Sequence, residues 1–266
     1  MTLAIKEISD IVPANTKSNN TIKHENNTAL NVSETTSQKM QKTKKYQSQK
    51  RPGRLSGSMP FEIHTADAEF LFSGHVEKDS ISVLQFGAQM TKIWDAAEQD
   101  DPYADWYLLK VYDAIHSCRE ALNESILSYQ QALQASYGSE HFKPTAFVSQ
   151  SPVTKQLWFR TQYGYLSANI IADYDTLMRL SLTAFRLGVL LDHNHEQLKN
   201  IWIKKILKVF KLPFQYESLG LSRQTMTEDL ELLKKSEEKM GILPHEILHK
   251  TLRAPFAPTI KSKPIL

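Results

Sequence analysis

One string in the sequence has the spacing of a catalytic zinc site. His245, Glu246 and His249 match the pattern H-E-x-x-H, which on a helix places two histidines on one face for zinc, with the glutamate as general base. Catalytic zinc needs three protein ligands, and none of the 17 residues after His249 is His, Asp, Glu or Cys. Pro244 also places the motif in the first turn of a short helix. We therefore expect the two histidines to face solvent, with no metal site and no enzymatic activity.

Two other polar groups could bind a metal or transfer protons. His193 and His195 fall in a predicted loop between two helices, where we interpret them as residues of a helix-ending loop. Asp100, Asp101 and Asp105 could act as paired carboxylates, but a helix N-cap followed by first-turn acids explains their positions. The sequence contains no G-x-x-x-x-G-K-[ST], G-x-G-x-x-G or G-x-S-x-G motif. We therefore expect no nucleotide site and no cofactor.

Basic residues are concentrated near the start of the chain. Residues 1–55 hold ten Lys and Arg against four Asp and Glu, although the net charge of the whole chain is only +3. Seven of the ten lie between Lys39 and Arg54, where there is no acidic residue. A basic arm on a near-neutral body is typical of polyanion binding, and a purely solubilising arm is the alternative. The predicted phosphate contacts of this arm are Lys42, Lys44, Lys45, Lys50 and Arg51.

A second basic surface is predicted on a helix from about residue 194 to 210. Its apolar side carries Ile201, Trp202, Ile206 and Val209, so the helix is amphipathic. The opposing lysines are Lys199, Lys204, Lys205, Lys208 and Lys211. An ordinary surface helix shows the same pattern, so we treat these lysines as a candidate second DNA-binding surface beside the arm.

Composition narrows the class of protein. The 266 residues are enough for one large domain or two small ones, and 41% of them are hydrophobic. The single cysteine, Cys118, cannot form an internal disulfide, and the first residues lack the features of a signal peptide. No stretch is apolar enough to span a membrane. We therefore expect a cytoplasmic protein that does not contact a membrane.

The first ordered elements are predicted after a disordered segment. Residues 14–58 are rich in Asn, Thr, Ser, Lys and Gln, so they cannot bury enough apolar surface to fold. Hydrophobic residues then alternate with polar ones, which predicts a strand over about 58–64. Helices follow over 66–73 and 81–97, with Thr65 and Ser80 as expected N-caps.

The remainder is predicted to be helical. Asp101 begins a helix that meets no further Pro or Gly until Gly138, and its heptad-like seam requires a partner helix or a second subunit. Residues 138–160 are predicted to be a loop. Further helices are predicted over about 163–191 and 194–210, then from Ser222 or Thr225 to Met240, with a last turn after Pro244. The fold class is therefore mainly α, with one short β element.

Three blocks of the sequence resemble a known family. They are residues 100–109 (DDPYADWYLL), 163–175 (YGYLSANIIADYD), and 240–244 (MGILP) followed by 253–258 (RAPFAP). The chain is similar over about residues 59–260 to a family from integrating conjugative elements and conjugative plasmids, which includes a transcriptional activator of transfer genes on IncC plasmids. The resemblance implies a dimeric DNA-binding activator with a ribbon-helix-helix element.

The predicted order of strand, helix and helix agrees with such an element. In a ribbon-helix-helix dimer one strand from each subunit pairs, and the two-stranded ribbon enters the major groove. Phe61 and Ile63 would then face the core. The expected base-facing residues are Arg54, Ser58, Glu62 and His64.

These inferences define an organisation and a function. We expect a disordered basic arm over 1–55, a ribbon-helix-helix-like element over 56–98, a helical body over 99–260 that is continuous with it, and a tail over 261–266. The predicted function is sequence-specific DNA binding by a homodimer that activates conjugative transfer genes. The expected partners are double-stranded DNA, a second copy of the chain and RNA polymerase. The alternative is a structural or accessory protein of the conjugation machinery.

Overall fold

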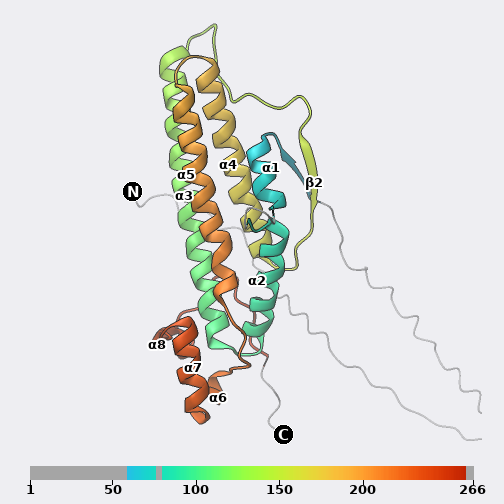
Figure 1. Ribbon diagram of the computed structural model, residues 1–266, viewed down its shortest axis with the longest axis vertical. Helices are drawn as coiled ribbons and strands as arrows, with labels where there is room; N and C mark the ends of the chain where they lie inside the picture. Colours follow the sequence, from blue (N-terminus) through green and yellow to red (C-terminus); the bar gives the residue numbers. More distant parts are fainter. Residues whose placement is uncertain (1–58, 76–79, 262–266) are drawn as a thin grey trace, which may run out of the picture. The chain divides into compact units, whose positions relative to one another are not determined.

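The computed structural model describes residues 59–75 and 80–261 (Figure 1). The predicted arm, the base-facing candidates Arg54 and Ser58, and residues 262–266 lie outside the described residues. The predicted mainly α-helical fold with a short β element is confirmed. In chain order the elements are β1 (Met59–Ile63), α1 (Ala66–Ser73), α2 (Val83–Glu98), α3 (Pro102–Tyr137), β2 (Val153–Leu157), α4 (Gln162–Arg186), α5 (Asp192–Lys211), a 3-10 turn (Leu212–Gln215), α6 (Arg223–Glu228), α7 (Leu230–Met240) and α8 (His245–Leu248).

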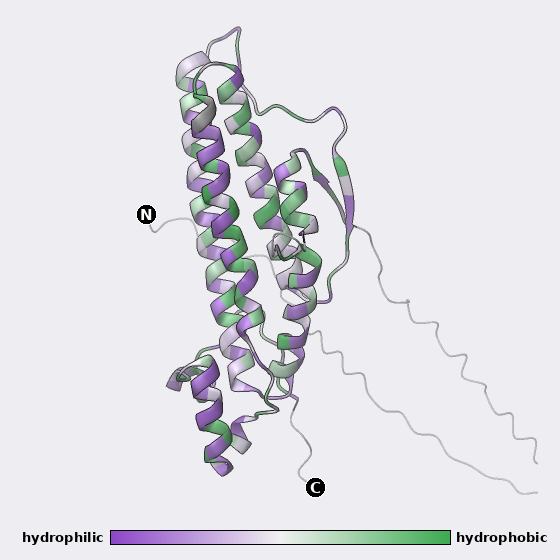
Figure 2. Ribbon diagram, in the orientation of Figure 1, coloured by the Kyte–Doolittle hydropathy of each residue, from purple (hydrophilic) through white to green (hydrophobic). Residues whose placement is uncertain are grey.

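The 36-residue helix α3 is the longest element of the described chain. Asp101 caps it as predicted, because its side chain accepts hydrogen bonds from the backbone N–H groups of Tyr103 and Ala104. The seam of α3 is buried against α4 and α5, which run beside it in Figure 1. The partner helices that the seam requires are therefore in the same chain. Figure 2 shows both hydrophobic and hydrophilic residues along each long helix, as expected for helices that bury one side.

Helix α2 begins two residues later than predicted. Ser82, rather than Ser80, is the N-cap, because Ser82 and Gln85 exchange side-chain to backbone hydrogen bonds in a capping box. Ser80 instead donates its backbone N–H to the His75 carbonyl oxygen across a short bridge. The buried residues of α1 and α2 include Leu71, Phe72, Phe86, Met90 and Ile93, and they join the core of the bundle.

The predicted loop over residues 138–160 contains a strand, and this prediction was wrong. Residues 153–157 form β2, which pairs antiparallel with β1 in a two-stranded sheet. Val153 and Thr154 are β-branched residues that favour a strand, and Pro152 lies just before it. In the described chain β1 therefore has a neighbour from the same molecule, and its pairing with a second copy stays a prediction.

Three helix ends differ from the sequence prediction. Helix α4 ends at Arg186 rather than near residue 191, and Gly188 follows it with a φ of 72°. The single helix expected from Ser222 or Thr225 to Met240 is divided at Asp229 into α6 and α7. The Asp229 side chain accepts a hydrogen bond from Leu232 N at 2.9 Å and so caps a new helix.

Candidate nucleic-acid interface

The outer face of the β1–β2 ribbon is polar and exposed. The register places Pro60 opposite Gln156 and Glu62 opposite Thr154, and all four residues are exposed. Because side chains alternate between the faces of a strand, these four residues share one face of the ribbon. The ribbon therefore presents two uncharged hydrogen-bonding side chains and one carboxylate to solvent.

The inner face of the ribbon is attached to α1. Ile63 and Leu157 are buried, and the ring of Phe61 stacks on Phe72 of α1 with 5.6 Å between the ring centres. Phe61 and Ile63 therefore face the core, as predicted. Lys155, also on this face, pairs with Glu69 of α1 at 2.9 Å. The pairing fixes the position of the ribbon relative to the helices.

The chemistry of the outer face suits base edges in the major groove. A glutamine side chain can pair with adenine through two hydrogen bonds, threonine can contact the thymine methyl group, and a carboxylate can accept from cytosine. A two-stranded ribbon is also narrow enough to enter that groove. Thr154 and Gln156 were missed by the sequence analysis because their segment was predicted to be a loop. The alternating, β-branched start of residues 153–157 was the available signal.

His64 lies just beyond the ribbon and is half-buried. Its Nδ1 atom accepts a hydrogen bond from Ser149 N at 3.3 Å. The backbone N–H groups of His64 and Thr65 both donate to Oδ1 of Asp175 on α4. The structure therefore joins the end of β1 to α4, and the predicted contact of His64 with a base stays a prediction.

The amphipathic character of α5 is confirmed. Trp202, Ile206 and Phe210 are buried, whereas four of the five predicted lysines, Lys204, Lys205, Lys208 and Lys211, are exposed. The placement of Ile201 on the apolar side was wrong, because its side chain is exposed. Lys205 lies over the ring of Trp202, with 4.4 Å from Nζ to the ring centre. Lys199 is less exposed and pairs with Glu196 at 2.7 Å. Figure 1 shows α1 and α4 between the ribbon and α5, so these are separate candidate surfaces.

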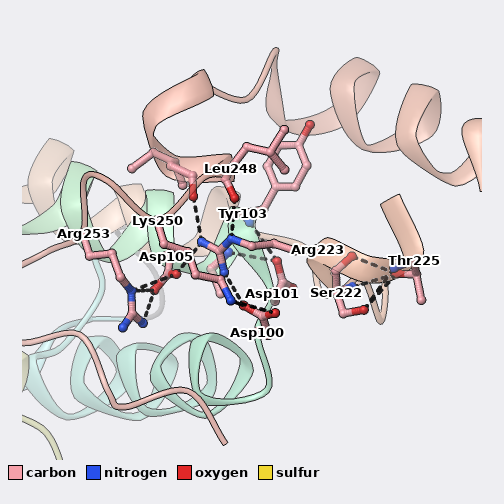
Figure 3. A network of polar contacts seen from close by, with 12 residues as sticks. Asp100, Asp101, Tyr103, Asp105, Ser222, Arg223, Thr225, Leu248, Lys250 and Arg253 are labelled. Carbon is pink, nitrogen blue, oxygen red and sulfur yellow. Dashed lines mark hydrogen bonds and ion pairs between the residues drawn. The ribbon is translucent and has the colours of Figure 1, made fainter. Parts of the chain in front are cut away.

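The acidic cluster predicted at the start of α3 is an anchor for the C-terminal segment (Figure 3). Asp105 is fully buried and pairs with Arg223 at 2.7 Å and with Arg253 at 2.7 Å. Arg223 also pairs with Asp100 at 2.6 Å and donates from Nε to the Leu248 carbonyl oxygen at 2.9 Å. Asp105 is therefore more than the first-turn acid that the sequence suggested, because it binds two arginines from distant parts of the chain.

Asp101 is buried in the same region and is held by neutral donors. The Tyr216 hydroxyl donates to its Oδ2 at 2.7 Å, and two backbone N–H groups donate to its Oδ1. Burial raises the pKa of Asp101 above its ordinary value, and these hydrogen bonds offset part of that effect. Burial also raises the pKa of Tyr216. Neither group is exposed for proton transfer to a substrate.

The histidine motifs have no metal-binding geometry in the described part of the chain. His245, Glu246 and His249 are exposed on the four-residue helix α8 and at its end, and the two imidazole rings lie 4.0 Å apart between centres. His193 and His195 lie in the first turn of α5, so their predicted place in a loop between helices was wrong. His195 is buried, and its Nδ1 lies 2.9 Å from the Ser181 hydroxyl. Among residues 59–75 and 80–261, no three His, Cys, Asp or Glu side chains gather as a metal site would require.

Two further features concern membrane spans and the chemistry of the cysteine. None of the helices in the described ranges combines the length and apolar character needed to cross a membrane. Burial raises the pKa of the Cys118 thiol to about 11, so this cysteine is protonated and unreactive at neutral pH.

Comparison with known proteins places this arrangement in a class. Residues 51–261 match the profile of a family of transcriptional regulators. That family is described as Transcriptional regulator AcaB, and because the match covers most of the sequence, the chain belongs to the AcaB family. The fold is also similar to the crystal structure of selenomethionine-containing AcaB from uropathogenic E. coli, with a TM-score of 0.50 and 10% sequence identity over 74% of this chain and 97% of that chain. A search of curated protein sequences gave no match.

Proposed function

We propose that the chain is a sequence-specific DNA-binding activator of conjugative transfer genes that acts as a homodimer in the cytoplasm. The observation that carries this proposal is the β1–β2 ribbon, whose outer face offers Glu62, Thr154 and Gln156 in a chain of a transcriptional regulator family. A ribbon of this kind can read base edges in the major groove. The non-enzymatic character of the proposal agrees with a family of regulators.

The sheet supports the homodimer in the proposal. It contains only two strands in the described chain, in the order β1–β2, so one edge of β1 has no strand beside it. An open strand edge presents N–H and C=O groups that can pair with another strand. In the proposed dimer the open edge of β1 contacts the second copy, and each copy presents its own two-stranded ribbon to DNA.

In this proposal the ribbon and the basic residues make different kinds of contact with DNA. Side chains on the ribbon read bases, whereas the arm lysines and arginine contact phosphates and supply affinity that does not depend on sequence. The exposed lysines of α5, on the far side of α1 and α4, form a second contact surface for DNA or for RNA polymerase. The predicted base contacts of Arg54, Ser58 and His64 belong to the same proposal.

A gel-shift assay with the full chain tests the proposal. The probes are promoter fragments of transfer genes from conjugative elements and mixed-sequence duplexes of the same length. We expect tighter binding to at least one promoter fragment, and light scattering should give twice the mass of one chain. Deleting residues 1–50 should weaken binding to both probes alike and flatten the salt dependence. Equal binding to all fragments, or no binding, would instead favour an accessory protein of the conjugation machinery.

A further inference from the structure

A basic pocket lies where the ribbon joins the helical body. It has a volume of about 200 Å³ and is bounded by His64 from the end of β1, Ser149 from the segment before β2, and Arg179 and Arg186 from α4. The two arginines are seven residues apart, about two helical turns, so they lie on the same side of α4. Two elements that are distant in the sequence, the end of β1 and helix α4, therefore bring three nitrogen-rich side chains to one cavity.

The wall of the pocket is held firmly in place. Phe147 N donates to the Thr183 hydroxyl at 2.9 Å, and Arg179 Nε donates to the Phe147 carbonyl oxygen at 2.9 Å. The Arg186 guanidinium lies 5.8 Å from the centre of the Phe147 ring. Helix α4 thus fixes the backbone on both sides of Phe147, and the arginines are oriented by the same residue.

The positive charge of the pocket is only partly compensated. Within the described residues Arg179 forms one ion pair, in which its Nη1 atom lies 3.8 Å from Oδ2 of Asp175. Oδ1 of Asp175 already accepts three hydrogen bonds from His64 and Thr65. Arg186 is exposed and forms no ion pair within the described ranges. Within the described residues, the one carboxylate that pairs with an arginine of the pocket is therefore Asp175, and it pairs with Arg179 alone.

His64 adds a further donor. Because its Nδ1 accepts the Ser149 N–H, the neutral ring carries its proton on Nε2, which can donate to a ligand. Arginine guanidinium groups offer paired N–H donors that match the oxygens of a phosphate. The free groups around the pocket are thus mainly donors with positive charge, which selects an anion.

We propose that this pocket binds a phosphate of the DNA backbone beside the groove that the ribbon enters. This inference rests on the proposed function, extends it to a specific contact, and assigns His64 to a phosphate in place of the predicted base. His64 directly follows Ile63, the last residue of β1, and lies two residues, or about 7 Å along a strand, from the outer-face residue Glu62. Phosphates line the edges of the groove, so a ribbon that reads bases needs backbone contacts at its flank to fix its register.

The test compares Arg186→Gln with the control Lys235→Gln in the full-length chain. Lys235 is an exposed lysine of α7, so both variants lose one exposed positive charge. The probe is a mixed-sequence duplex of about 30 base pairs, three turns of B-DNA. We expect the slope of log affinity against log salt to fall by about 0.9 per chain for Arg186→Gln and to stay unchanged for the control. Arg186→Lys, which keeps the charge, should retain most of the slope.

A second measurement, with inorganic phosphate, tests whether the pocket binds the DNA backbone or a free phosphate compound. A DNA-backbone site should give the same thermal midpoint with and without millimolar phosphate in the wild type and in Arg186→Gln. A phosphate-induced rise that is lost in Arg186→Gln, with an unchanged DNA slope, would assign the pocket to a free phosphate compound and overturn the proposal. If the wild type binds the duplex and Arg186→Gln matches the control, this inference alone fails. If the wild type binds no duplex at low salt, the proposed function fails with it.

Discussion

The Asp175 carboxylate on α4 accepts two hydrogen bonds from Thr65, one from the backbone N–H and one from the hydroxyl, each at 2.8 Å. Thr65 is also the N-cap of α1, where its side chain accepts from Ala68 N. One nearly buried carboxylate on the central helix therefore determines where the ribbon ends and where the first helix begins. The geometry of the candidate DNA-reading face depends on this contact.

Replacing Asp175 with alanine should destabilise the protein. The change leaves the N–H groups of His64 and Thr65 without their acceptor at a site where the Asp175 side chain is only 5% exposed. Loss of hydrogen bonds to a buried charged group should lower the free energy of unfolding by about 3 kcal/mol. Urea unfolding measures this, with Asp113→Ala on the exposed side of α3 as the control, expected to change it by about 0.5 kcal/mol or less. Equal stability of the two variants would contradict the anchoring role of Asp175.

Replacing Arg223 with methionine should be more damaging. Asp105 is fully buried and would keep only Arg253, while Asp100 would lose its closest cation. Removing one partner of a buried ion pair costs about 3–5 kcal/mol, because it leaves a charge uncompensated. Denaturant unfolding should show this loss, and proteolysis should cleave the segment after residue 221 more readily than in the wild type. A variant within about 1 kcal/mol of the wild type would show that the network does not hold the C-terminal segment.

Local signals in the sequence predicted the helices well and the long-range pairings poorly. The Asp101 cap and Pro102 at the first position define the start of α3, and the described helix begins there. β2 was missed because five residues flanked by a long irregular segment give little periodic signal, and its strand character depends on pairing with β1. Thr154 and Gln156 were missed for the same reason.

The buried acidic cluster also combines one feature that the local sequence predicts with others that it does not. Asp101 was recognisable as a cap from its neighbours alone. The ion pairs of Asp105 with Arg223 and Arg253 join residues 118 and 148 positions apart, so no local pattern could reveal them. The amphipathic pattern of α5 predicted the buried Trp202 and Ile206 and the exposed lysines, because it repeats over several turns, but it wrongly placed the exposed Ile201 on the buried face.

The raised pKa of Asp101 predicts a specific pH dependence. A carboxyl group whose pKa is higher in the folded than in the unfolded protein favours folding most below its ordinary pKa near 4, and this contribution is lost as the pH rises through the folded value. An asparagine side chain at this position would keep the cap without ionising. The stability of Asp101→Asn relative to wild type should therefore increase from pH 4 towards neutral pH. Thermal unfolding across this range measures the difference, and a constant or falling difference would contradict the assignment.

Metal removal should have no effect on the protein. His245 and His249 are exposed at a helix of four residues, and the sequence offers no third ligand after them. We expect EDTA and the variant His249→Ala to leave the thermal midpoint and DNA binding unchanged. Elemental analysis that finds one zinc per chain, lost in His249→Ala, would restore the zinc-site interpretation.

The most direct test of the central claim is the effect of the ribbon's outer face on sequence preference. The measurement is a ratio of two affinities, one for the best sequence selected from a random DNA pool and one for mixed-sequence DNA. It is made for Gln156→Ala, for Thr154→Ala and for the control Gln131→Ala. Gln131 is an exposed glutamine of α3. If the ribbon reads bases, the ratio should fall about five- to 150-fold in a ribbon variant that loses a base contact, equivalent to about 1–3 kcal/mol, and stay unchanged in the control. An unchanged ratio in both ribbon variants, with intact binding to DNA, would contradict the claim that this face reads the sequence.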